Sequence, residues 1–201
     1  MQLVTKSMLK EKALIKDYTR EAENYDEKRY IGDVNEYNEK VREKVILDFF
    51  EVNSEMMVLD VATGTGRGML YFASRCKKVV GVDGTLSMLE KAKEKLKHNN
   101  NVEIQVADAL KLPFKDNSFD IVTTFNFLHL FRHPKRQKLF VNEMKRVLKK
   151  DGILCIELDN ALHGIILGFI RKYFIHNIGY NWPWQIKSII GKDMKIVKIV
   201  G

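Results

Sequence analysis

Short apolar runs alternate with amphipathic helical stretches along this chain, and the alternation limits the folds that it can adopt. The runs, too short for buried helices, are residues 57–61, 79–82, 102–106, 121–125 and 153–158, and the helical stretches are residues 34–50, 86–98 and 135–148. Strands that alternate with helices form parallel βαβ units, and strands apolar on both faces are covered on both sides. The sequence therefore predicts a doubly wound, mostly parallel α/β sheet in three layers, α/β/α.

The 201 residues, 45% hydrophobic and 30% charged, predict a single globular domain. We divide it into an N-terminal helical cap (residues 1–55), a core (56–160) and an aromatic and basic segment (161–201). Residues 194–200 predict a sixth strand, and none remain for the seventh that such a sheet ordinarily has. We therefore expect six strands with the seventh absent, in a chain that is naturally short or is cut.

The net charge of +8 is unevenly distributed, since residues 161–201 hold six Lys or Arg and one Asp. Such a basic end suits nucleic acid, anionic lipid or an acidic substrate, or serves solubility alone. Two cysteines, Cys76 and Cys155, cannot form a zinc cluster alone and fit a reducing compartment. No secretory signal or run of about 20 apolar residues is found, so we expect a cytoplasmic protein without a metal or a transmembrane segment.

Glycines and an acid follow the first predicted strand. Asp60 ends the strand, and glycines at 64, 66 and 68 allow a sharp turn that a ligand can approach closely. A dinucleotide fingerprint requires a glycine at 69, where Met69 stands, so a nicotinamide oxidoreductase is disfavoured. A glycine-rich turn alone is equally compatible with a plain tight turn.

Further acids end the next two predicted strands. Asp83 is placed to accept hydrogen bonds from ribose hydroxyls, although an acid here also fits a helix cap. Asp108 can accept from an exocyclic amine while the Ala109 amide donates to a ring nitrogen, or Asp108 is simply a turn residue. Acids at neighbouring strand ends indicate a nucleotide-like ligand more strongly together than singly.

Four segments in this order resemble the successive motifs of class I S-adenosylmethionine-dependent methyltransferases, in particular the subgroup of ubiquinone/menaquinone C-methyltransferases. The segments are VLDVATGTGRG (58–68), VVGVDGTLSMLEKAKEK (79–95), VADALKLPFKDNSFDIV (106–122) and MKRVLKKDGIL (144–154). The resemblance implies a Rossmann-like fold, S-adenosylmethionine as cofactor and S-adenosylhomocysteine as product. It places Asp60 and Gly64 at the methionine part, Asp83 at the ribose, and Asp108 with Ala109 at the adenine.

The cofactor loop departs from the family pattern at several positions. Ala62 replaces the usual first glycine of the loop that also holds Gly66, and alanine is the smallest possible change. Gly84 stands where a bulky apolar residue is usual beside adenine, so that face of the site is looser or is filled by Met88. Lys150 and Asp151 replace a common Pro-Gly before the fifth strand, which we expect to affect only a turn.

The acceptor side is less specific in sequence. His129 is the best candidate base, although a histidine among apolar residues is often a core residue. Tyr25 resembles the family tyrosine that closes over the cofactor, or is simply exposed. The aromatic segment after residue 160 fits an apolar acceptor cavity, a membrane surface or a helix pair packed on the sheet.

The resemblance implies methyl transfer to a small or lipid-soluble acceptor by in-line displacement. Nucleic-acid amino groups are disfavoured as acceptors, because no Asn-Pro-Pro-Tyr tetrapeptide follows the fourth strand. The alternative is an RNA- or protein-binding module that keeps the fold without catalysis. The acceptor, the methylated atom, the use of a general base and the oligomeric state stay open at this point.

Overall fold

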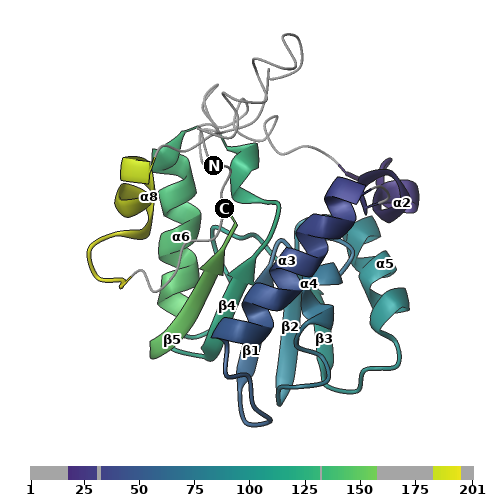
Figure 1. The fold of residues 1–201 in the computed structure, drawn as a ribbon, viewed down its shortest axis with the longest axis horizontal. Coiled ribbons are helices and arrows are strands. Elements are labelled where there is room, and N and C mark those ends of the chain that lie inside the picture. The colour runs from purple at the N-terminus through teal and green to yellow at the C-terminus, as the bar shows by residue number, and fades with distance from the viewer. Residues whose placement is uncertain (1–17, 31–32, 132, 158–182, 196–201) are drawn as a thin grey trace, which may run out of the picture.

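The computed structural model describes residues 18–30, 33–131, 133–157 and 183–195, which fold around one parallel sheet (Figure 1). Its strands are β1 (Met57–Val61), β2 (Lys78–Asp83), β3 (Val102–Val106), β4 (Phe119–Thr124) and β5 (Leu148–Ile156). They are parallel and lie in the order β3-β2-β1-β4-β5. The winding direction reverses between β1 and β4, and ligands of such sheets bind at the carboxyl ends beside this point.

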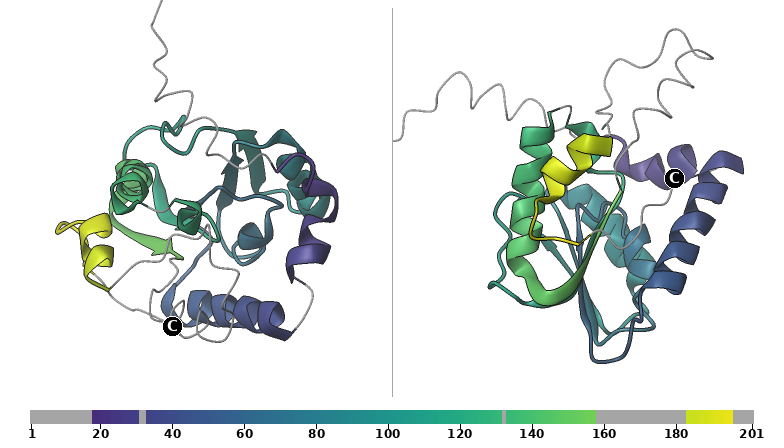
Figure 2. Two further views of the ribbon diagram at one scale, coloured as in Figure 1. Left: turned by 90° about the horizontal axis from the view of Figure 1, so that it is seen from above. Right: turned by 60° about the vertical axis from the view of Figure 1, so that its left-hand side comes forward.

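Helices cover both faces of the sheet, as predicted. One face carries α3 (Asp33–Phe49), α4 (Arg67–Leu70) and α5 (Leu86–Leu96), and the other carries α6 (Pro134–Val147) and α8 (Pro183–Ile190). Figure 2 shows α3 and α6 on opposite sides of the strands. The short elements η1 (Ala22–Asn24), α2 (Tyr25–Tyr30) and η2 (Leu128–Leu130) lie toward the carboxyl ends of the strands.

The central strand β1 explains why both faces are covered. Val58 is fully buried in the core cluster that contains Ile46 of α3, and its neighbour Leu59 is fully buried in the other cluster, which contains Met144 of α6. Successive side chains of a strand point to opposite faces, so a strand with both of these apolar requires cover on each side. The three-layer α/β/α fold is confirmed.

The fifth strand begins earlier than the sequence predicts. The sequence predicts a helix to residue 148 and a turn at Lys150 and Asp151, but β5 starts at Leu148 and runs through residues 149–151. Their charged side chains are exposed, and among the described strands β5 pairs only with β4. An edge strand tolerates charges that would exclude a segment from the sheet interior, which is why the polarity of this stretch was misleading.

Other expectations fall on residues that lie outside the described ones. The sixth strand was predicted at residues 194–200, of which only Met194 and Lys195 are described, and neither is in a strand. Residues 161–182 of the aromatic and basic segment likewise lie outside the described residues. Within the described ranges the sheet has five strands.

Gly66 supports the fold through a close approach to α5. Its φ of 78° is left-handed, and a Cβ there would lie 2.9 Å from Leu96 Cδ1 and 3.0 Å from Ala92 Cβ. Gly64 has a similar φ of 55° but nothing within 4 Å of a built Cβ. Substitution of Gly64 therefore introduces backbone strain alone, whereas substitution of Gly66 introduces both backbone strain and a steric clash.

We expect Gly66→Ala to lower the free energy of unfolding by about 2–4 kcal/mol, because it adds a steric clash to a left-handed backbone. Gly64→Ala should cost only the backbone part, about 1 kcal/mol. Urea denaturation of both variants measures the difference. Equal losses would show that the contact with α5 is unimportant.

Candidate active site

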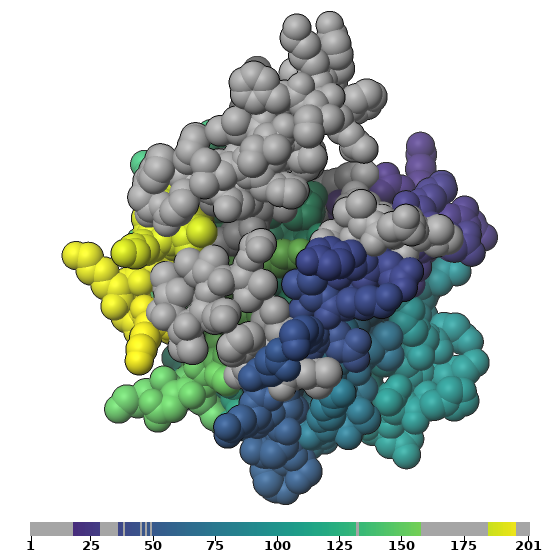
Figure 3. Space-filling model, viewed as in Figure 1, coloured from purple at the N-terminus to yellow at the C-terminus, as the bar shows by residue number. Residues whose placement is uncertain are grey.

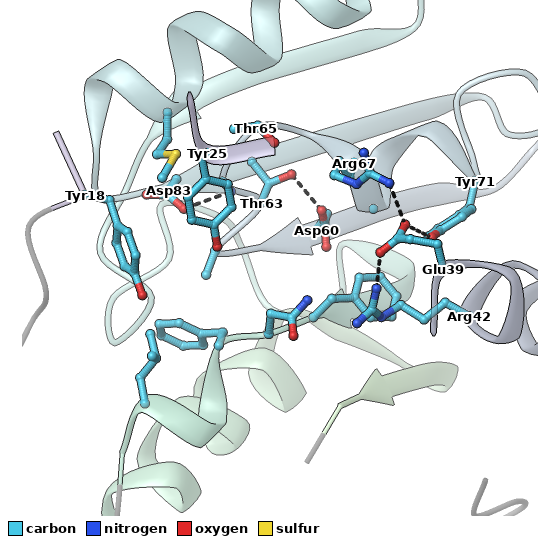
Figure 4. A pocket seen from close by; sticks show the side chains of 18 residues that line it. Tyr18, Tyr25, Glu39, Arg42, Asp60, Thr63, Thr65, Arg67, Tyr71 and Asp83 are labelled. Atoms are coloured by element: carbon cyan, nitrogen blue, oxygen red, sulfur yellow. Dashed lines mark hydrogen bonds and ion pairs between the residues drawn. The ribbon is translucent and has the colours of Figure 1, made fainter. Parts of the chain in front are cut away.

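A pocket opens at the carboxyl ends of β1, β2 and β4, beside the point where the winding reverses. It encloses about 700 Å³, including the space at its mouth. The N-terminal segment, α3, the glycine loop after β1, the end of β2 and the turn after β4 line it, through Tyr18, Tyr25, Glu39, Arg42, Asp60, Ala62, Thr63, Gly64, Thr65, Arg67, Gly68, Tyr71, Asp83, Met88, Phe125, Asn126, Phe127 and Leu130. In Figure 4, Tyr18 and Tyr25 lie at one end of the pocket and a cluster of charged side chains lies at the other, with Asp60 between them.

Asp60 places a buried carboxylate at this pocket. Its side chain accepts hydrogen bonds from Thr63 Oγ1 at 2.6 Å and from Thr123 Oγ1 at 2.8 Å, and the residue is only 2% exposed. Burial raises its pKa from 3.8 to about 6. The nearby charge of Asp83 also raises this pKa, whereas the hydrogen bonds from the two hydroxyls lower it. A buried carboxylate without a cation beside it is costly, so the site suits a positively charged ligand group.

Asp83 holds the glycine loop against the start of α5. One carboxylate oxygen accepts from the Gly64 amide at 2.9 Å and the other from the Thr85 amide at 2.8 Å. Burial raises its pKa, although these amides oppose the shift. The Thr85 hydroxyl and the Gly84 amide also interact with this carboxylate, and a carboxylate accepts about four hydrogen bonds, so a ligand hydroxyl would share or replace these donors. The bond to Thr85 spans two residues and ends at the residue that precedes α5, so Asp83 orders the turn before the helix and does not cap the helix itself.

The loop itself is shaped by left-handed residues. Ala62 has φ 57° and Gly64 φ 55°. A Cβ at Gly68 would lie 2.8 Å from Asp60 Oδ2 and 2.8 Å from Phe125 Cδ2, so only glycine lets these walls meet so closely. Ala62 therefore carries backbone strain that glycine would not.

The N-terminal segment is fastened over the loop by polar bonds. Asp26 of α2 accepts from Thr65 Oγ1 at 2.6 Å and forms an ion pair with Lys95 of α5. This brings Tyr25 into the pocket lining, where its ring packs edge-on against Tyr18 with centroids 5.7 Å apart. Both rings therefore form one aromatic wall.

The opposite end is a cluster of ion pairs centred on Glu39 of α3. Its carboxylate accepts from Tyr71 Oη at 2.7 Å, lies 3.3 Å from Arg67 Nη2 and pairs with Arg42 (Figure 4). Arg42 also forks onto Glu157, with Nη2 to Oε1 at 2.8 Å and Nε to Oε2 at 3.2 Å. The cluster joins α3, α4 and the end of β5.

The predicted site residues divide into two groups. The pocket is lined by Tyr25, Asp60, Ala62, Gly64, Asp83 and Met88, and it is not lined by Gly66, Gly84, Asp108, Ala109 or His129. Asp108 lies in an exposed turn, where it accepts from the Leu110 amide at 2.8 Å, and His129 lies in η2. The ligand contacts of this second group stay predictions.

Sequence reasoning missed the charged cluster. Glu39 and Arg42 lie three residues apart on a helix rich in charges, and nothing local distinguishes them from the exposed pair of Glu36 and Lys40. Their low exposure would have been detectable only as a polar interruption of the apolar face of α3. Among the described residues, neither a group of side chains that could hold a metal ion nor a helix able to cross a membrane is found.

Comparison with known proteins agrees with this geometry. Residues 59–156 match the model of a methyltransferase domain family. A solved SAM-dependent methyltransferase from Aquifex aeolicus is 25% identical and superposes with a TM-score of 0.55 over 74% of this chain and 76% of the other. Residues 59–156 of this chain are therefore a methyltransferase domain of the S-adenosylmethionine-dependent type. S-adenosylmethionine is thus the cofactor that this methyltransferase domain implies.

Two further relatives extend the comparison. A demethylmenaquinone methyltransferase from Staphylococcus haemolyticus is 34% identical over 139 residues, which are 67% of this chain and 57% of the relative. The YcgJ protein of Bacillus subtilis is 27% identical with a TM-score of 0.62, over 75% of this chain and 66% of that one. This methyltransferase chain thus spans a little over half the length of the curated relative.

The pH dependence of stability tests the burial of Asp60. Because its pKa is raised to about 6 from 3.8, the folded protein binds this proton more tightly than the unfolded chain. Its contribution to stability is therefore lost as pH rises from about 4 to about 6. Asp60→Asn should then be more stable than the parent at pH 7.5, by about 2–3 kcal/mol at about 1.4 kcal/mol per pKa unit.

Denaturation of the two proteins at several pH values checks this, and the advantage of the variant should shrink toward pH 4. Asp151→Asn, at an exposed position, is the matched control and should show little difference at any pH. A constant difference between Asp60→Asn and the parent across this range would contradict the prediction.

Proposed function

We propose that this chain binds S-adenosylmethionine in the pocket at the ends of β1, β2 and β4 and transfers its methyl group to a small, lipid-soluble acceptor. The observation that carries the proposal is the pair of acids at the pocket, the buried Asp60 and the half-buried Asp83, which the glycine loop connects. Such a pair can bind a ligand that carries both a cationic group, at Asp60, and two neighbouring hydroxyls, at Asp83.

The residues present fit the cofactor. Asp83 lines the pocket, and its two carboxylate oxygens, held by the Gly64 and Thr85 amides, are placed to accept hydrogen bonds from ribose hydroxyls. Asp60 supplies a negative potential in a region shielded from water, where charge interactions are strong. The empty space beside Gly64 leaves the loop backbone open to close approach.

Bound S-adenosylmethionine supplies a methyl group on a positively charged sulfur, which a nucleophile displaces in line to leave S-adenosylhomocysteine. The protein then has mainly to align the acceptor and exclude water. The aromatic residues Tyr18, Tyr25, Phe125 and Phe127 line the pocket and do both. A general base is needed only if the acceptor loses a proton, and His129 stays the predicted candidate.

We further propose a quinone-type acceptor. Support comes from the aromatic lining of the pocket and from relatives named demethylmenaquinone methyltransferase and ubiquinone/menaquinone biosynthesis C-methyltransferase. Flat aromatic side chains pack well on a quinol ring. The proposal places the protein in the cytoplasm, where it meets its acceptor at a membrane surface.

Asp83→Ala should weaken binding of S-adenosylhomocysteine by about 10- to 100-fold, because it removes a charged acceptor of hydrogen bonds. Isothermal titration calorimetry measures this directly. Glu90→Ala, an exposed acid on α5, is the matched control and should bind as the parent does. Unchanged affinity in Asp83→Ala would remove the ribose contact from the proposal.

Methyl transfer itself is tested with tritium-labelled S-adenosylmethionine and reduced demethylmenaquinone in detergent micelles. We expect label in the extracted quinone with the parent and much less with Asp83→Ala when the cofactor is kept below its dissociation constant for the variant. A parent protein that binds S-adenosylhomocysteine but labels no quinol would overturn the quinone assignment. If it also labels no other acceptor, the alternative of a binding module without catalysis gains support.

A further inference from the structure

The turn after β4 has a conformation that few side chains adopt. Asn126 has φ 52°, in the left-handed region, which asparagine tolerates better than most residues. Phe125 and Phe127 on either side line the pocket together with Asn126. Small changes in this turn therefore move two aromatic rings of the pocket wall.

A carboxylate from the neighbouring strand end holds this turn. The backbone amide of Asn126 donates a hydrogen bond to Glu157 Oε2 at 2.9 Å. Glu157 itself is fixed because its backbone amide donates to Thr124 O at 3.1 Å. The side chain of Glu157 thus spans from the end of β5 to the turn after β4.

Arg42 holds Glu157 in this position. Its guanidinium contacts both carboxylate oxygens, at 2.8 Å and 3.2 Å, and its side chain is only 13% exposed. It also lies 6.0 Å from the centroid of the Phe125 ring. A planar guanidinium can grip a carboxylate with two donors and lie over a ring, and lysine cannot reproduce this geometry.

The hydrogen bonds of the cofactor acids do not extend to the turn of residues 125–127, although Asp60 and Phe125 both lie beside Gly68. Asp60 and Asp83 have partners of their own on the glycine loop, β4 and α5. Among the described residues, neither acid forms a hydrogen bond or an ion pair with Arg42 or Glu157. Disturbing the pair should therefore alter the β4 turn while leaving the acids in place.

We propose that Arg42 and Glu157 are a positioning pair that fixes the turn of residues 125–127 and so orients the acceptor-side wall of the pocket. Arg42 acts on the turn through Glu157, from a helix more than 80 residues earlier in the chain. The effect on turnover rests on the proposed function, whereas the effect on the turn does not.

Amide hydrogen exchange tests the effect on the turn without any substrate. In Glu157→Ala and in Arg42→Ala, the Asn126 amide should exchange about 10- to 100-fold faster than in the parent, because a charged hydrogen bond is lost or loosened. Arg42→Lys and Glu157→Gln, which keep size or one acceptor oxygen, should lie between. Lys40→Ala, which breaks an exposed pair on the same helix, should match the parent.

Ligand measurements separate positioning from general damage. Affinity for S-adenosylhomocysteine should change less than threefold in Arg42→Lys and Glu157→Gln. Methylation of reduced demethylmenaquinone should fall about 10- to 100-fold in kcat/KM, since small misplacements of reacting groups have effects of this size. Thermal melts show which variants are folded.

The proposal is overturned if Arg42→Lys and Arg42→Ala, both folded, leave exchange at Asn126 as in the parent. It is also overturned if affinity for S-adenosylhomocysteine falls as much as turnover, because the pair would then serve the cofactor site. A parent that methylates no quinol contradicts the proposed acceptor, and in that case exchange at Asn126 alone decides the role of the pair.

Discussion

A carboxylate buried at the end of the central strand shapes the architecture around it. Asp60 is almost fully enclosed, and the loop, the neighbouring strand and the start of α4 adjust to it. Thr63 and Thr123 donate hydrogen bonds to it. Glycine at position 68 lets α4 lie close to Asp60, because any side chain there would clash with the carboxylate. A charge in such a place costs stability, and its raised pKa reports that cost. Proteins retain such groups where a ligand uses them.

Polar bonds hold the N-terminal part of the molecule over this centre, while apolar contacts anchor it. Ile46 in the last turn of α3 and Phe50 directly after the helix are buried in the core, on the sheet face that α3, α4 and α5 cover. Toward its start, α3 is held by Glu39 and Arg42, and α2 is held by Asp26. In the space-filling view α3 forms a diagonal band across the front of the molecule (Figure 3). Partly exposed ion pairs are weaker than a packed core, so these contacts position the pocket wall more than they stabilise the fold.

Much of the fold was predictable because the strands lie inside a three-layer structure. A strand covered on both sides must be apolar on both faces, so the inner strands β1, β2 and β4 are visible as short apolar runs. β3 lies at one edge and alternates apolar residues with Glu103 and Gln105. β5 broke this rule at Lys149 and Lys150, since an edge position relieves the demand for apolar residues. The cofactor loop was equally visible, because glycines and an acid after a strand leave a local pattern.

The sequence by itself determined the fold class, the family and the acids at the strand ends, because each depends on periodicity or on residues close together in the chain. Only the tertiary structure decided that Asp60 and Asp83 line one pocket, whereas the ligand contact of Asp108 stays a prediction. The tertiary structure alone brought Arg42 to Glu157, 115 residues away. Such a contact depends on how α3 packs across the sheet, and a charge on a helix carries no local mark of the partner that packing will give it.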